Sequence, residues 1–435
     1  MSRQKLKNHA KLLRYLENKL TSPNFISTYR TGPKYFTRNR SFTFKSLSLF
    51  IISTIQSSIQ RELDRFFRTF NNQLLAYKFV SQSAFSQARL KIKPEAFLEL
   101  RQGITKLFYT NYAVKKWNGL RLIAIDGSEL MLPKNTDTIE QFGEYTTNFM
   151  NKTIVLARVS KAYDVLNKMN IDAKLVNRNI GEHVLANQHL EYCGVGDLLL
   201  MDRGYPSYDL FMNILAKGSD FCARLTVSTW GVATKLVDSG QKEVIVDILP
   251  RNDLKRMYKK QGKTIEPIKC RLVCVELSTG EKEVLITSLL DTHKYPYSIF
   301  KHLYHLRWDI EESYKIDKHR LQLENFSGKS ITAIYQDFYA SLLLSNITSI
   351  LSYSLGDRIN EKTKKAGLKY QINYTSALAK VKEAIALIFT NREMENLLKK
   401  LLNILVSNIL PVRPNRQYER KKQKRRRYPR TYLSL

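Results

Sequence analysis

Apolar residues change their spacing along the chain, and these changes divide it into regions of different predicted structure. From residue 43 to residue 115 they recur at helical spacing, which predicts a helical N-terminal region. From residue 119 onward, apolar runs of strand length alternate with helical segments, which is typical of a layered α/β fold. The expected strands cover residues 120–125, 154–159, 171–176, 198–201 and 221–227, with helices at 181–192 and after Ser207.

Residues 228–290 interrupt this alternation. They are polar and contain three runs of alternating apolar residues and a hairpin signal at 278–280, which predicts a β-rich insertion. Helices are expected again at 298–326, 330–355 and 375–410. We therefore expect five parts: a basic helical region (1–115), the first part of an α/β core (116–227), the insertion (228–290), the second part of the core (291–356), and C-terminal helices with a basic tail (357–435).

One stretch of the N-terminal region has the pattern of a DNA-binding motif. A turn at residues 79–81 precedes a short helix capped by Ser81, and we expect Gln82, Gln87 and Arg89 on its exposed face. Such side chains suit base edges and phosphates, as in a helix-turn-helix motif. An ordinary capped helix has the same pattern, so the motif is a hypothesis.

Charge favours a polyanionic partner. The 435 residues carry 71 Lys and Arg against 39 Asp and Glu, a net charge of +32, and 43% of them are hydrophobic, as in a globular protein. Eleven basic residues and one acid lie in the first 46 positions, and ten basic residues and one acid lie in residues 413–430. Nucleic acid is the first candidate partner and an anionic membrane surface the second. Basic ends can equally be solvated tails.

The remaining composition indicates a protein of a reducing compartment. Four scattered cysteines are too few for a disulfide framework, and the polar N-terminal segment lacks the apolar core of a signal peptide. Because no uninterrupted apolar run approaches the roughly 18 residues of a spanning helix, we expect no membrane segment.

Two acidic residues occupy matching positions after predicted strands. Asp126 precedes Gly127, and Asp202 precedes Arg203 and Gly204. The carboxyl ends of strands in an open α/β sheet are where ligands and metals bind, and two carboxylates there suit Mg²⁺. An Asp before a Gly is also ordinary turn chemistry.

A third acid lies on the helix expected after residue 298. At about 100° per residue, Tyr304, Arg307, Glu311 and Lys318 fall on one narrow arc beside the apolar stripe of that helix. The arc selects Glu311 from its acidic neighbours as the side chain able to approach the two aspartates. A solvated helix with ion pairs four residues apart has the same periodicity.

The spacing Tyr304-x2-Arg307-x3-Glu311-x6-Lys318 matches the signature of the bacterial insertion-sequence transposases of family four. These are cut-and-paste enzymes with an Asp-Asp-Glu (DDE) triad. The residues around Asp126 and Asp202 resemble the first two triad motifs of that family, and residues 79–97 resemble a stretch ahead of its catalytic domain. The resemblance covers roughly residues 75–330.

This resemblance implies an RNase H-like catalytic core interrupted by the insertion and flanked by helical regions. By the same resemblance, Asp126, Asp202 and Glu311 would hold two Mg²⁺ ions about 3.5–4 Å apart, with Mn²⁺ substituting, for cleavage at element ends and strand transfer into target DNA. Further DNA contacts are expected from eight residues: Tyr304, Arg307, Lys318, Trp230, Trp308, Arg89, Gln87 and Arg203. Trp230 and Trp308 are the candidates for stacking a flipped base.

The implied partners are the element's terminal inverted repeats, target DNA and a second copy of the chain in a synaptic complex, within the cytoplasm and nucleoid of a bacterium. Two alternatives remain open. The alternatives to a transposase are a nuclease of the same fold that cuts without joining, and a catalytically inactive DNA-binding protein descended from a transposase.

Overall fold

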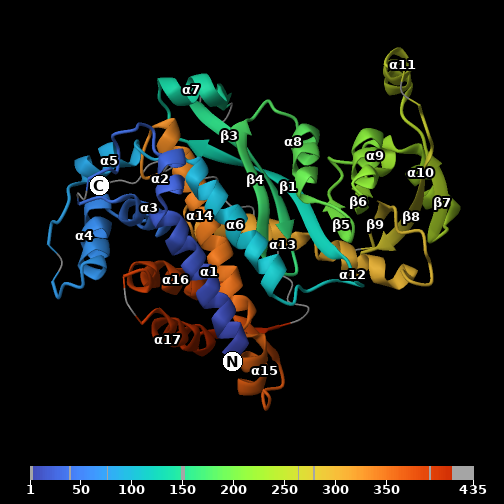
Figure 1. Cartoon of the computed structure of the whole chain (residues 1–435). Coiled ribbons are helices and arrows are strands. Elements are labelled where there is room, and N and C mark those ends of the chain that lie inside the picture. The colour runs from blue at the N-terminus through green and yellow to red at the C-terminus, as the bar shows by residue number, and fades with distance from the viewer. Residues whose placement is uncertain are drawn as a thin grey trace. The chain divides into compact units, whose positions relative to one another are not determined.

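The computed structural model describes residues 3–38, 41–75, 77–147, 152–262, 264–277, 280–390 and 393–413, and the chain forms two compact units (Figure 1). Unit 1 comprises Met1–Val114, Leu130–Ala157 and Lys315–Leu435, and unit 2 comprises Lys115–Glu129 and Arg158–Tyr314. The predicted C-terminal basic run after Arg413 and most of the predicted hairpin at 278–280 lie outside the described residues.

Unit 1 is mainly helical, as the spacing of apolar residues after residue 43 predicts. Its central helix α14 (Ile331–Tyr353) is capped by the Ser330 side chain and is buried along most of its length. Figure 1 shows α6 (Glu95–Asn111) beside it, and α1 (Arg3–Thr21) packs against α6. The other helices of unit 1 are α2 (Pro23–Tyr29), α3 (Phe44–Ile52), α4 (Ile59–Phe70), α5 (Gln82–Arg89), α7 (Thr136–Phe142), α15 (Gly356–Lys362), α16 (Tyr374–Ile388) and α17 (Met394–Ser407).

Two short strands of unit 1, β10 (Lys369–Ile372) and β11 (Ile409–Val412), pair antiparallel. Among the described residues, no single helix is long and apolar enough to cross a membrane; α14 and α15 meet that criterion only together, with a bend of 50° between them.

Unit 2 is built on a mixed sheet in which β1 (Arg121–Leu132), β5 (Asp197–Met201) and β6 (Asp220–Leu225) run parallel. Beyond β6, the antiparallel strands β9 (Lys282–Thr287), β8 (Ile268–Glu276) and β7 (Glu243–Ile248) continue the sheet (Figure 1). On the other side of β1 lies β3 (Lys152–Asp164), which also pairs with β4 (Met169–Asn177). The first half of β3, which belongs to unit 1, pairs with β2 (Glu144–Thr147).

The helices of unit 2 follow the strands of the sheet. They are α8 (Glu182–His189), α9 (Tyr208–Ala216), α10 (Gly231–Ser239), α11 (Asn252–Lys260), α12 (Phe300–His305) and the first half of α13 (Trp308–His319). Ser207 caps α9, as predicted. Residues 228–290 contain the three predicted strands, and also the helices α10 and α11, which the alternating pattern did not predict.

The helix predicted over residues 298–326 is wrong as one continuous element. The chain forms α12, turns at residues 306 and 307, and then forms α13, which ends at His319. The periodicity of the apolar residues continues through this turn, because Leu303 and Ile310 are both buried on the same side. A pattern of apolar positions therefore did not reveal the break.

Candidate active site

The two aspartates lie where the parallel pairing of β1 and β5 ends. Asp202 follows β5, but Asp126 lies within β1, which continues to Leu132 and not, as predicted, only to residue 125. Ile125 of β1 pairs with Met201 of β5, so Asp126 and Asp202 come next at adjacent positions of the sheet. Both side chains are half-buried. Burial raises the pKa of Asp126 to about 6; Arg307 opposes this shift, while Glu311 and Asp202 add to it. Asp126 therefore lies within the electric field of both other predicted triad acids.

Asp202 is held by an arginine from the next strand. Arg224 of β6 donates from Nε to Asp202 Oδ1 at 3.0 Å and from Nη1 to Glu283 at 2.6 Å. Burial pushes the pKa of Asp202 upward, but the backbone N–H of Arg203 and the charges of Arg307 and Arg224 outweigh it and leave that pKa below its usual value. The carboxylate of Asp202 is therefore ionised at neutral pH. The side chain of Arg203 itself is exposed.

Glu311 reaches the same site through Arg307. The buried Arg307 side chain donates to Glu311 Oε1 at 2.9 Å, and its Nε atom has no hydrogen-bond partner. Burial acts to lower the pKa of this guanidinium, but Tyr304, Asp202, Glu311 and Asp126 together raise it above its usual value. One arginine thus interacts with all three predicted triad acids.

Two tyrosines attach the α12–α13 segment to the strand ends. Tyr304 is buried and donates to Asp202 Oδ1 and the Met201 carbonyl oxygen, both at 3.3 Å. Tyr314 donates to the carbonyl oxygen of Asp126 at 2.8 Å. Both bonds connect elements of unit 2 that are more than 100 residues apart in the sequence. They fix Glu311 on the same side of the sheet as the two aspartates.

The donor set suits a hard divalent cation. Three carboxylates supply the oxygen ligands that Mg²⁺ prefers. A bound cation would favour the ionised form of Asp126, whose pKa is raised by burial and, to a smaller extent, by Glu311 and Asp202. Within the described residues, no three His, Cys, Asp or Glu side chains stand close enough together to hold a metal ion as they are. Glu311 and Asp202 are instead each paired with an arginine, so a cation must compete with those two ion pairs.

The other predicted DNA contacts differ in how far their side chains are exposed. Trp308 is 39% exposed, and the centre of its ring lies 5.8 Å from the Arg307 guanidinium carbon. Trp230 is half-buried and packs against the hydrophobic core of unit 2. Lys318 lies on the last turn of α13, in the part of that helix that belongs to unit 1, and is half-buried. Gln87 is exposed on α5.

The prediction that Arg89 lies on an exposed face is wrong. Its side chain is 2% exposed and donates to four acceptors of unit 1: Gln336 Oε1 at 2.9 Å, Ser327 Oγ at 2.7 Å, the Ala333 carbonyl oxygen at 3.2 Å and Asp337 Oδ1 at 2.7 Å. The helical pattern of α5 placed Arg89 outside because its partners lie some 240 positions later in the sequence. We therefore withdraw Arg89 as a DNA contact.

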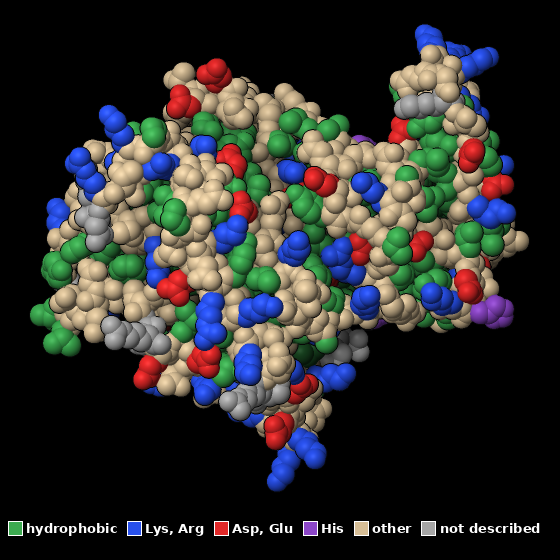
Figure 2. Space-filling view, in the orientation of Figure 1, with side chains coloured by type: hydrophobic (Ala, Val, Ile, Leu, Met, Phe, Trp, Pro, Cys, Tyr) green, Lys and Arg blue, Asp and Glu red, His purple; other side chains and the backbone are tan. Residues whose placement is uncertain are grey.

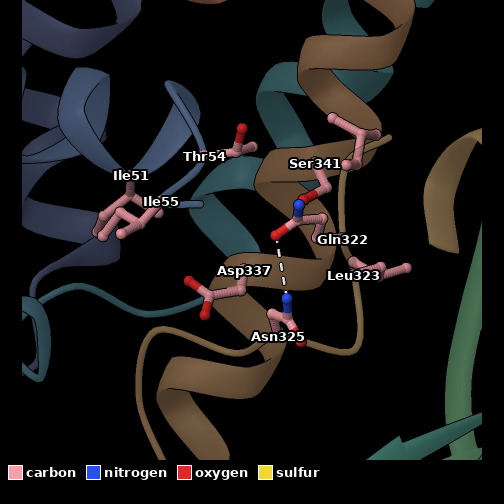
Figure 3. Close-up of a pocket in the computed structure, with 9 residues that line it drawn as sticks. Ile51, Thr54, Ile55, Gln322, Leu323, Asn325, Asp337 and Ser341 are labelled. Carbon is pink, nitrogen blue, oxygen red and sulfur yellow. Dashed lines mark hydrogen bonds between the residues drawn. The ribbon is translucent and has the colours of Figure 1, made fainter. Parts of the chain in front are cut away.

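Asp337 also borders a small pocket of unit 1 (Figure 3). This pocket is lined by Ile51, Thr54, Ile55, Leu321, Gln322, Leu323, Asn325, Asp337 and Ser341. A hydrogen bond of 3.0 Å from Asn325 to Gln322 spans part of it. None of the predicted site residues lines this pocket, so it has no part in the site described above.

Two contributors to the site were not predicted from the sequence. Arg224 is a polar residue near the end of β6, the strand beside β5. That position is the signal by which it could have been predicted. Tyr314 lies three residues beyond Glu311 on α13, on the helical face already selected for Glu311. Neither residue has a local motif of its own.

Comparisons with known proteins agree with the resemblance seen in the sequence. Residues 117–347, which include Asp126, Asp202 and Glu311, match the family described as "Transposase DDE domain". Over 271 residues the chain is 23% identical to transposase InsG for insertion sequence element IS4 of Escherichia coli (strain K12). That alignment covers 62% of this chain and 60% of InsG, so it spans less than two thirds of the relative's length.

Among solved structures, the chain is similar to piggyBac transposase in a synaptic complex with hairpin DNA, with a TM-score of 0.46 and 11% identity, covering 94% of this chain and 87% of that one. The family match covers more than half of the chain. The protein therefore belongs to the family of transposases with a DDE domain and is a distant homologue of the IS4 transposase InsG.

Proposed function

We propose that the protein is a cut-and-paste DNA transposase that cleaves DNA at the ends of a mobile element and joins the free 3′ ends to target DNA. The observation that carries this proposal is the convergence of Asp126, Asp202 and Glu311 on one buried arginine, where the parallel pairing of β1 and β5 ends. Membership of the DDE transposase family supports the same reaction.

We propose further that unit 2 is built on an RNase H-like catalytic core. The parallel strands β1, β5 and β6 with the helices α8 and α9 support this proposal, and the region from α10 to β9 corresponds to the predicted β-rich insertion. The domain limits at residues 115, 227, 290 and 356 stay predictions.

Asp126, Asp202 and Glu311 would hold Mg²⁺, with Mn²⁺ as a substitute. A bound divalent ion would supply charge stabilisation to the phosphoryl group in an in-line displacement. Within the chain, Arg307 keeps three like charges close together, and Arg224 aligns Asp202. Tyr304 fixes the distance between α12 and β5 through its bond to Asp202. Tyr304 and Arg307 are therefore positioning residues as well as predicted phosphate contacts.

DNA is the proposed substrate and partner. The net charge of +32 supports binding to phosphates. Figure 2 shows Lys and Arg side chains gathered over α11, where Arg256, Lys259 and Lys260 are exposed. We propose that this helix, together with Lys318 and Gln87, contacts DNA. The piggyBac complex contains hairpin DNA. For this chain, we also propose that two element ends are paired and that the protein acts as a homodimer.

The test is a cleavage assay with purified protein and labelled duplexes of the DNA that flanks its gene. In Mg²⁺ or Mn²⁺ the protein should cut at the element ends and transfer the 3′ ends to a target plasmid, and EDTA should abolish both products. Glu311→Gln should bind the duplex normally and lose cleavage by about 10³-fold or more, because only the cation site is damaged.

The matched control is Glu312→Gln, which changes an exposed acid one position away. It should cut like the unaltered protein. Cleavage without joining would indicate a nuclease, and binding with no cut in any metal would indicate an inactive DNA-binding protein. Full cleavage by Glu311→Gln would refute the assignment of the third acid.

A further inference from the structure

Both aspartate motifs contain a glycine, and both glycines face the same side chain. A Cβ atom added to Gly127 would lie 2.9 Å from Glu182 Oε1, and one added to Gly204 would lie 3.6 Å from Glu182 Oε2. Glu182 is the first residue of α8 in unit 2. Its carboxylate therefore lies between the residue after Asp126 and the second residue after Asp202.

Backbone conformation does not account for these glycines, and space does so only at Gly127. At Gly204 an added Cβ atom would make an ordinary van der Waals contact with Glu182. Neither Gly127 nor Gly204 has a positive φ, so their backbones are open to any residue. At Gly127 a methyl group would approach the Glu182 oxygen more closely than real Cβ atoms approach their neighbours. The glycine of the first motif thus leaves room for a fourth carboxylate next to the triad acids.

The helix that carries Glu182 is firmly anchored. At its far end, His189 bonds to Asp172 of β4 at 2.8 Å and to Ser160 of β3 at 2.9 Å, and all three side chains are buried. This Ser-His-Asp arrangement is closed to solvent, so its part is structural. It fixes α8 against the sheet and keeps Glu182 at the strand ends.

A second group near Glu182, the hydroxyl of Tyr205, lacks a hydrogen-bond partner. The hydroxyl of Tyr205 is buried and has no hydrogen-bond partner, and the side chain is 1% exposed. Burial raises the pKa of this hydroxyl, and the charges of Glu182, Asp126 and Asp202 raise it further, with Arg158 opposing. The charges of Glu182, Asp126 and Asp202 thus act on this unpaired hydroxyl, which an ordered ligand or water would satisfy.

We propose that Glu182 is a fourth carboxylate of the active site and contributes to binding of the divalent cation by Asp126 and Asp202. This inference rests on the proposed function, because it uses the same cation site. The unpaired Tyr205 hydroxyl would then donate a hydrogen bond to a water or ligand held at this site.

A simpler role for Glu182 makes a different prediction. An acid in the first turn stabilises a helix through the helix dipole, whichever way its side chain points. That role does not require a glycine at position 127. If it were the whole role, Glu182→Gln would lower the melting temperature and leave cation binding unchanged.

Cation binding is tested directly with Mn²⁺ and full-length protein, without DNA, by electron paramagnetic resonance or calorimetric titration. Glu182→Gln should weaken Mn²⁺ binding by about tenfold, the low end of the 10–100-fold loss typical of groups that support metal ligands. Glu191→Gln is the matched control, an exposed acid at the other end of the same helical segment. It should bind Mn²⁺ normally. Melting curves check that each variant folds.

Gly127→Ala gives independent evidence, because its methyl group displaces the Glu182 carboxylate and leaves every acid in place. It should weaken Mn²⁺ binding, and adding Glu182→Gln to it should cause little further loss. Unchanged Mn²⁺ affinity in a folded Glu182→Gln variant would overturn the inference. If Asp126→Asn also bound Mn²⁺ normally, the proposed function would fail as well; if Asp126→Asn lost binding, only the role of Glu182 would fail.

Discussion

Two buried arginines, one in each unit, differ in how completely the protein satisfies them. Arg89 of unit 1 donates to four acceptors, and its one acidic partner, Asp337, is paired with it at 2.7 Å. Arg307 of unit 2 makes one hydrogen bond, to Glu311, and leaves its Nε unpaired among three acids. A buried arginine with a complete set of hydrogen-bond partners, such as Arg89, has a structural role. An incomplete set, as at Arg307, indicates a site where a ligand binds.

The largest expected effect is a loss of folding stability, which distinguishes the structural role of Arg89 from the role of Arg307. Arg89→Ala leaves Asp337, Ser327 and Gln336 without their shared donor in the interior, and should lower the free energy of unfolding by about 3–5 kcal/mol. Chemical denaturation measures this change, with Gln87→Ala on the exposed face of the same helix as a control, expected within about 0.5 kcal/mol of the unaltered protein.

The matched substitution Arg307→Ala sharpens the contrast. It removes the positive charge among three acids, so added Mg²⁺ should raise its melting temperature more than that of the unaltered protein. In Arg89→Ala, Mg²⁺ should raise the melting temperature by the same amount as in the unaltered protein. An equal response of all three proteins to Mg²⁺ would mean that Arg307 is as purely structural as Arg89.

A smaller effect concerns the pH dependence of Asp126. Its carboxyl has a pKa of about 6 in the folded protein, above the ordinary 3.8. Above pH 6 the folded state carries the full cost of this buried charge, and the cost disappears as pH falls through 6 toward 4. Without divalent cations, Asp126→Asn should therefore melt at a higher temperature than the unaltered protein at pH 7.5.

Below about pH 4, Asp126→Asn and the unaltered protein should have the same melting temperature, because Asp126 is then largely protonated in the folded and in the unfolded state. The control is Glu312→Gln, an exposed acid of α13, for which no such pH-dependent gain is expected. If Asp126→Asn gave no gain at pH 7.5, burial of the ionised Asp126 carboxylate would not destabilise the folded protein as its raised pKa implies.

Local pattern predicted much of the fold and the triad. Asp126 and Asp202 could be found because each ends an apolar run, and the parallel register of β1 and β5 turns that sequence position into spatial proximity. Glu311 could be found by its helical arc, although the chain turns at residues 306 and 307 before α13. The apolar stripe continues through that turn, and Glu311 still lies beside Arg307, as their shared arc predicts. The role of Glu311 in the triad stays a prediction.

Contacts between distant segments could not be predicted in the same way. Arg89 looked exposed because the groups that bury it come from residues 327–337. Glu182 has no motif of its own, and its place beside Gly127 and Gly204 follows only from the packing of α8 on the sheet. Arg224 is similar, since its bond to Asp202 depends on the pairing of β5 with β6.

The central claim is that Asp126, Asp202 and Glu311 form one divalent-cation site. It is tested most directly by replacing Mg²⁺ with Fe²⁺ and generating hydroxyl radicals at the bound ion, which cut the polypeptide near its ligands. We expect cuts close to residues 126, 202 and 311, suppressed by excess Mg²⁺ and absent in Asp126→Asn. Cuts elsewhere, or cuts that persist unchanged in Asp126→Asn, would contradict a shared site for the three acids.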